Sequence, residues 1–159
     1  FMKSGMLHAY LHGVGVEIMA NSDNVLRGGL TSKHIDVPEL MHVVQFDALL
    51  DPIAPAENVV LSSHGIVPAE GIETVEYLTP VPEFRLSRSH LAPCRESHLG
   101  IEGPFIVLVT EGTVTLTSRE CPEGLSVSAG HAAWVGAWED RPTIATGENS
   151  ATVFIARVP

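Results

Sequence analysis

The sequence predicts a mainly β protein built from many short strands. Apolar residues make up 45% of the 159 residues and charged residues only 18%, which is typical of a folded globular chain and not of a disordered one. After residue 70, short runs of β-favouring residues recur at intervals of about ten residues, with turn residues between them. The 14 glycines and 11 prolines are spread along the chain instead of clustered. This pattern favours a β-sandwich or a barrel.

The expected strands of the second part of the chain are separated by residues that favour turns. Glu111-Gly112, for example, lies between two of them and is typical of a tight hairpin. The regular spacing of the strands favours a jelly-roll barrel of the cupin type. We expect strands at 74–79, 83–91, 105–109, 113–117, 125–127, 132–135, 143–146 and 151–158.

One short helix is expected before the barrel, at about 36–46. Asp36 suits the N-cap, Pro38 the first turn, and Glu39 the third position after the cap, as in a capping box. Apolar residues at positions 37, 40, 41 and 44 then form a single stripe along the helix.

The segments around this helix divide the chain. Two further short strands are expected at 6–11 and 14–19, because glycines mark a turn between them. Residues 48–70 are expected to be a linker or long loop, since three prolines interrupt them. We therefore expect two domains, one at 1–47 and the other, the barrel, at 48–159.

Charge and hydropathy exclude several classes of partner. A net charge of -10 argues against nucleic acid and anionic membranes, although one or two local cations would still bind a small phosphorylated substrate. No apolar stretch approaches the length of about 18 residues that a membrane helix needs, and residues 1–20 do not resemble a signal peptide. Two cysteines, Cys94 and Cys121, suit free thiols in a reducing compartment. We expect a cytoplasmic protein.

Side chains that can carry chemistry are crowded into the first 35 residues. His8 and His12 cannot share one metal on a strand, where they would lie about 13 Å apart. Glycines beside them disfavour the helix that would bring them together. At most one of them is a ligand, and a lone strand histidine is more often structural. The full set is His8, His12, Glu17, Asp23, Arg27, Lys33 and His34.

Each of the other residues in this set also has an ordinary structural interpretation. Glu17 in a strand can face solvent, Asp23 can serve a turn, and Arg27 can be a surface charge. The residues alone therefore indicate a site but do not name its reaction.

A resemblance names that reaction. Residues 8–36 read HAYLHGVGVEIMANSDNVLRGGLTSKHID. This stretch resembles the signature block of type I, zinc-dependent mannose-6-phosphate isomerases, whose pattern is HAYL-x-G-x-x-(V/I)-E-x-M-A-x-SDNV-x-R-x-G-(L/F)-T-x-K. Residues 77–87 and 151–157 also resemble the C-terminal cupin domain of that family. The resemblance covers essentially the whole chain and identifies it as similar to the C-terminal half of such an enzyme.

The resemblance implies roles for five residues. In that family zinc is held by a glutamine, two histidines and a glutamate, and His8 matches the last histidine. Arg27 matches the catalytic arginine, Asp23 and Glu17 match acidic residues of the active site, and Lys33 matches a lysine of the substrate pocket. The other three zinc ligands belong to an N-terminal half that this chain does not contain, so 1–47 would be the remnant of a catalytic cupin domain.

The implied activity is the interconversion of mannose 6-phosphate and fructose 6-phosphate by zinc-assisted proton transfer through a cis-enediol. Such a reaction needs a base, a group that stabilises the developing oxyanion, and a cation that binds the phosphate. Because three ligands are missing, we expect the chain alone to be inactive and to bind zinc weakly. Its natural partner would be the missing half, and unpaired strand edges would favour self-association.

Two other functions compete with this one. The first is a non-catalytic cupin module that binds a sugar phosphate or a protein partner. The second is an unrelated cupin metalloenzyme, which would need a compact cluster of histidines and acids. His90, Cys94 and His98 have a spacing that could bind a second zinc on a helix, but Pro93 argues against a helix there. We expect Trp134 and Trp138 to pack in the core or at the barrel mouth.

Overall fold

The computed structural model describes residues 1–21, 25–47, 53, 56–58 and 65–159. It divides into two compact units, a first unit of residues 1–54 and a second unit of residues 55–159. The assignment of the first unit to a catalytic domain stays a prediction.

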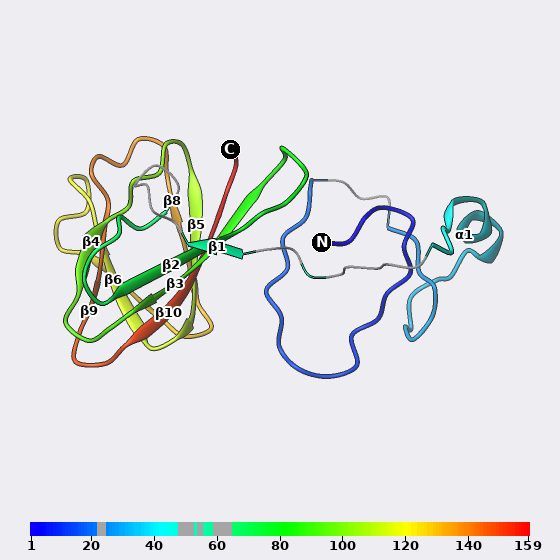
Figure 1. Ribbon diagram of the computed structural model, residues 1–159, viewed down its shortest axis with the longest axis horizontal. Coiled ribbons are helices and arrows are strands. Elements are labelled where there is room, and N and C mark those ends of the chain that lie inside the picture. Colours follow the sequence, from blue (N-terminus) through cyan, green and yellow to red (C-terminus); the bar gives the residue numbers. More distant parts are fainter. Residues whose placement is uncertain (22–24, 48–52, 54–55, 59–64) are drawn as a thin grey trace. The chain divides into compact units, whose positions relative to one another are not determined.

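The second unit is a β-sandwich of two antiparallel sheets (Figure 1). The large sheet has the strand order β1-β2-β3-β10-β5-β8 and the small sheet the order β4-β9-β6-β7. The expected mainly β, cupin-type jelly-roll class is confirmed. The strands are β1 (Ala56–Asn58), β2 (Ile72–Tyr77), β3 (Arg85–Leu91), β4 (Glu96–His98), β5 (Phe105–Glu111), β6 (Thr113–Thr117), β7 (Leu125–Ser128), β8 (Ala132–Val135), β9 (Thr143–Thr146) and β10 (Ala151–Arg157).

The core lies between the two sheets because alternate residues of each strand point inward. On β5, Val107 and Val109 are fully buried. Ile106, which precedes Val107 and points to the other face of the sheet, is 40% exposed. Val114 of β6 and Ile144 of β9 meet them from the small sheet, each 0–1% exposed. Each such side chain contributes about 1.5–3 kcal/mol by leaving water.

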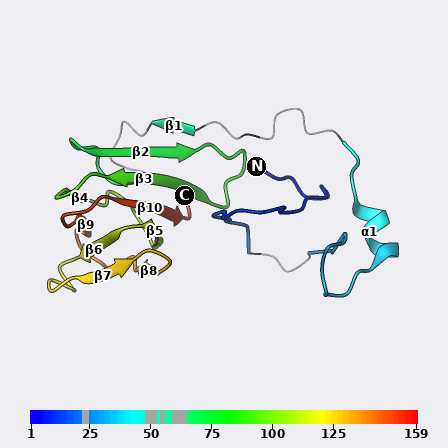
Figure 2. The same ribbon diagram turned by 90° about the horizontal axis from the view of Figure 1, so that it is seen from below.

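The last strand, β10, lies in the middle of the large sheet. It pairs with β3 on one side, from Ala151↔Leu91 to Arg157↔Arg85, and with β5 on the other. Figure 2 shows β2, β3 and β10 side by side. This strand therefore joins the earlier and later parts of the unit into one sheet.

All eight strands expected after residue 70 are present, with ends shifted by a few residues. Two strands of three residues each were not predicted, β1 and β4. β4 reads Glu-Ser-His and buries only Ser97, so it carries no alternation of apolar and polar residues. The expectation that Trp134 and Trp138 pack in the core or at its mouth is not met, because their side chains are 60% and 70% exposed.

The first unit contains the expected helix, α1, which spans Val37–Val43. Asp36 caps it, and its Oδ1 accepts a 3.0 Å hydrogen bond from the Glu39 N–H. The helix ends earlier than the expected 46, since Val44 is already extended. The next residue, Gln45, leaves the helix because its N–H donates to the Gly5 carbonyl at 2.8 Å.

The two strands expected at 6–11 and 14–19 do not form, and that prediction is wrong for the described residues. A strand needs a neighbour to satisfy its backbone groups, and here only a single bridge joins Met6 to Gln45. Among the described residues of the first unit none is buried, and the side chains of Leu11 and Val14 are almost fully exposed. The local pattern favoured strands, but no partner is present to pair with them. In the described parts of both units, no helix is long and apolar enough to cross a membrane.

Candidate functional site

His8 lies on an extended, exposed segment of the first unit. Its Nδ1 is 3.4 Å from the carbonyl oxygen of Met6. The imidazole also meets the ring of Tyr10 edge to face, with ring centroids 6.0 Å apart and an angle of 86° between the planes. Side chains two residues apart share a face in an extended chain, which explains this contact.

Tyr10 connects His8 to a second predicted site residue. Its hydroxyl hydrogen-bonds the carboxylate of Glu17, and this bond, followed by partial desolvation and the charge of Glu17, raises the pKa of Tyr10. His8, Tyr10 and Glu17 therefore form one group. Sequence reasoning gave Tyr10 no role, although its position two residues after His8 on an extended segment was a usable signal.

The remaining predicted site residues are not joined to this group in the described part of the chain. Arg27 is half-buried and Lys33 is exposed, with its backbone N–H bonded to Thr31 Oγ1 at 3.1 Å. Asp23 lies outside the described residues. The structure thus brings together two of the five predicted residues, His8 and Glu17, through a third that was not predicted.

No metal centre is formed by the residues that the structure describes. They contain no group of three or more histidine, cysteine, aspartate or glutamate side chains placed to hold an ion. Zinc in proteins takes about four ligands, so His8 alone does not make a zinc site. His90 lies on β3 with its Nδ1 3.3 Å from Thr152 Oγ1, and His98 lies on β4 in the other sheet.

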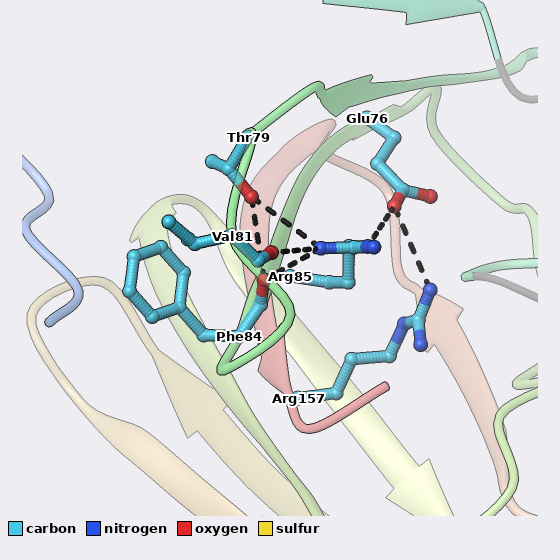
Figure 3. A network of polar contacts seen from close by, with 6 residues as sticks. All are labelled: Glu76, Thr79, Val81, Phe84, Arg85 and Arg157. Carbon is cyan, nitrogen blue, oxygen red and sulfur yellow. Dashed lines mark hydrogen bonds and ion pairs between the residues drawn. The ribbon is translucent and has the colours of Figure 1, made fainter. Parts of the chain in front are cut away.

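A partly buried ionic network occurs in the second unit, where Arg85 and Arg157 lie in the segments that resemble the isomerases and Glu76 directly precedes the first of them (Figure 3). Glu76 Oε1 lies 3.6 Å from Arg85 Nε and 3.6 Å from Arg157 Nη2. The side chains of Glu76 and Arg157 are 14% and 9% exposed. Burial lowers the pKa of Arg157, the charge of Glu76 opposes that shift, and Arg85 adds to it. Sequence reasoning missed this network.

Arg85 also holds the loop between β2 and β3. Its Nη1 donates to the carbonyls of Val81 at 2.7 Å and Phe84 at 3.1 Å. Figure 3 shows the guanidinium of Arg85 between Glu76 and these carbonyls. The network therefore fixes the loop to the end of β10, which is a structural function.

A polar hollow of about 720 Å³ lies on the outer face of the large sheet. There Thr152 Oγ1 donates to Glu111 Oε2 at 3.0 Å and contacts His90. A smaller pocket of about 130 Å³ is lined by apolar residues, including Leu116, and by Glu139. Neither contains a predicted site residue.

Comparison with solved structures places the fold. The polyketide cyclase RemF from Streptomyces resistomycificus has a TM-score of 0.50 at 14% identity, over 64% of this chain and 72% of that chain. A cupin superfamily protein from Desulfitobacterium hafniense has a TM-score of 0.46 at 10% identity, over 58% and 81%. At 14% identity the likeness to the cyclase concerns the fold alone, and a TM-score of 0.46 is too low to support a conclusion.

Comparison with curated sequences finds relatives that match nearly the whole chain. No family model matches the chain. Proteins named mannose-6-phosphate isomerase match it with 36% identity in Salmonella typhimurium (92% of this chain, 34% of the relative), 34% in Escherichia coli (97% and 36%) and 31% in Aspergillus fumigatus (98% and 35%). The chain thus spans about a third of the length of these relatives. By sequence, the chain resembles the C-terminal part of proteins named mannose-6-phosphate isomerase.

Proposed function

We propose that this chain acts as the C-terminal part of a zinc-dependent mannose-6-phosphate isomerase that interconverts mannose 6-phosphate and fructose 6-phosphate. The observation that carries the proposal is the block of residues 8–36, which keeps the polar residues of the isomerase pattern in order. The names of the relatives support it across nearly the whole chain.

Arg27 is proposed to stabilise the negative charge that develops during the reaction. Moving a proton between C1 and C2 of the sugar passes through a cis-enediol, so charge gathers on a sugar oxygen. A guanidinium stays charged and donates two hydrogen bonds in a fork, which suits such an oxygen. Arg27 is half-buried, and partial exclusion of water strengthens this interaction.

Glu17 and Asp23 are proposed for the proton transfer and Lys33 for the phosphate. A carboxylate accepts a proton from carbon only if its position is fixed, and the hydrogen bond with Tyr10 orients Glu17. Lys33 is an exposed point charge in a chain of net charge -10, which suits a contact with a phosphate dianion.

His8 is proposed as one zinc ligand, with the other ligands supplied by residues outside this chain. The described residues complete no zinc site by themselves. We therefore expect the 159-residue chain to show no isomerase activity with added zinc.

A chimaera tests the proposal. It joins the part of the Salmonella typhimurium enzyme that precedes the matched region to residues 1–159 of this chain. With zinc, the chimaera should convert mannose 6-phosphate, and Arg27→Met should lower its kcat by a factor of about 100 or more. Arg119→Met, which changes an exposed arginine of the second unit, is the matched control and should leave kcat unchanged.

Two outcomes would contradict the proposal. One is a folded chimaera that binds zinc but does not turn over the sugar phosphate. The other is clear turnover by the 159-residue chain alone, which would show that the metal ligands and the base all lie within it.

A further inference from the structure

The two sheets of the second unit have different outer faces. On the small sheet, Thr115 pairs with Ser126 and Thr113 with Ser128, and all four side chains are exposed. Hydroxyl groups are well solvated, so this face is suited to water. One solvated face is the usual condition of an antiparallel sheet.

Part of the outer face of the large sheet is apolar. One row crosses five adjacent strands, from β2 through β3, β10 and β5 to β8, with an apolar residue on each. The register links them in the order Tyr77, Leu86, Ala156, Ile106 and Trp134. Ile106 is 40% and Trp134 60% exposed.

The neighbouring row repeats this pattern with one exception. It runs through Val75, Arg88, Phe154, Leu108 and Ala132, of which only Arg88 is polar. We call the nine apolar residues of these two rows the apolar band. Figure 2 shows the strands that carry most of it lying side by side.

A polar row marks one edge of the apolar band. Glu73 pairs with His90, and Thr152 lies between His90 and Glu111, bonded to the carboxylate at 3.0 Å. The change from polar to apolar within one face shows that the apolar band is a bounded patch. A sheet with apolar residues on both faces is typical of one that is covered on both sides.

We propose that the apolar band is a docking face within the complete protein. It is covered by the part of the polypeptide that precedes this region in mannose-6-phosphate isomerases. This proposal rests on the proposed function. The relatives carry about twice the length of this chain outside the matched region, since the match covers 34% and 36% of two of them.

The size of the apolar band favours a covalently connected occupant over a second copy. Five strands at about 4.8 Å and two rows at about 7 Å give an area on the order of 300 Å² per partner. Two copies would bury on the order of 600 Å², about half of what a stable dimer needs. An interface of that size is ordinary between domains of one chain, because the connection supplies a high effective concentration.

Charge favours the same occupant. Each copy of the chain carries a net charge of -10, so two copies repel each other before their faces meet. The polar row beside the apolar band adds two carboxylates, Glu73 and Glu111, which would approach their counterparts in many pairings of two copies.

The test compares cysteine labelling in the 159-residue chain and in the chimaera described above. Ile106→Cys places a thiol in the centre of the apolar band, and Ser126→Cys places one on the solvated face of the small sheet. The labelled peptides are quantified by mass spectrometry. In the chimaera, labelling at 106 should slow by a factor of about ten or more, and labelling at 126 should change less than about twofold.

Every outcome bears on the proposal. Equal rates at 106 in the two proteins would overturn it, and so would a 159-residue chain that is dimeric and already protected at 106, because a second copy would then cover the face. If circular dichroism shows that the Ile106→Cys variant is unfolded, Ala132→Cys, a smaller change in the same band, takes its place.

Isomerase activity of the same chimaera separates the two proposals. An active chimaera unprotected at 106 refutes the docking face alone, and an inactive one protected at 106 supports it while refuting the activity.

Discussion

At the scale of single residues, Tyr10 is the most informative side chain of the first unit. It touches the imidazole of His8 on one side and hydrogen-bonds Glu17 on the other. A residue in that position offers the carboxylate of Glu17 a hydrogen-bond donor. Tyr10 thereby acts on the site through Glu17 and needs no contact with the substrate.

The pKa of Tyr10 tests this contact. Its folded value lies above the ordinary 10.0, so the stability that the hydrogen bond contributes is present below pH 10 and is lost as the pH rises through the raised value. Glu17→Gln should lower the pKa of Tyr10 toward 10.0, measured by the ultraviolet absorbance of tyrosinate. Tyr10→Phe assigns the transition, since only Tyr77 then remains. An unchanged titration in Glu17→Gln would show that the bond does not exist in solution.

A substitution at Glu76 tests the partly buried ionic network of the second unit. Glu76→Gln removes the carboxylate that pairs with both Arg85 and Arg157, so the free energy of unfolding should fall by about 2 kcal/mol in urea titrations. The control is Asp140→Asn, which removes an exposed ion pair with Arg119 and should cost about 0.5 kcal/mol or less. Equal losses in the two variants would mean that burial adds nothing to the network.

At the scale of elements, partners decide which predicted strands exist. Strands such as β5 and β10 alternate buried and less buried residues because successive side chains point to opposite faces of the sheet and one face packs on the core, and that alternation is readable in the sequence. Residues 6–11 and 14–19 have similar local signals, but among the described residues only the single bridge from Met6 to Gln45 pairs with them. β4 shows the converse, because pairing with β9 makes a strand of Glu-Ser-His without any pattern. Local sequence therefore predicts the tendency to extend, and only the fold supplies the partner.

The turn between β5 and β6 depends on one glycine. Gly112 has φ 73°, and a Cβ there would clash with the Ser150 carbonyl oxygen. Gly112→Ala should therefore lower the free energy of unfolding by about 2 kcal/mol or more. Gly147→Ala is the matched control, since a Cβ at that position meets nothing within 4 Å and should change stability by about 0.5 kcal/mol. A tolerated Gly112→Ala would show that the β5–β6 turn can rearrange.

At the scale of the whole molecule, the two units differ in how their apolar residues are placed. The second unit has one continuous core, from Ile66 to Ile155, whereas the described part of the first unit buries no residue.

The five site residues could be named from the sequence only through the resemblance of the block at 8–36. Spacing alone could not place them, because their proposed partners lie elsewhere in the longer relatives. The contact of Tyr10 with His8 and Glu17 needed the structure.

Native-state hydrogen exchange should separate the two units in the 159-residue chain. Amides of Val107 and Val153 should exchange only through global unfolding, because they lie in central strands with fully buried side chains. Amides of residues 7–19 should exchange near the rate of an unfolded peptide, since no strand pairs with them in the described structure. Strong protection across 7–19 would show that this segment pairs in solution.

The central position of β10 has a consequence for synthesis of the protein. Among the strands of the second unit β10 is translated last, so β3 and β5 leave the ribosome without the neighbour that joins them. Until residue 157 has emerged, the sheet is open in its middle and presents two unpaired edges inside the unit. A premature stop only a few codons before that point would remove the centre of the sheet. The nascent second unit should therefore depend on chaperones until β10 is free.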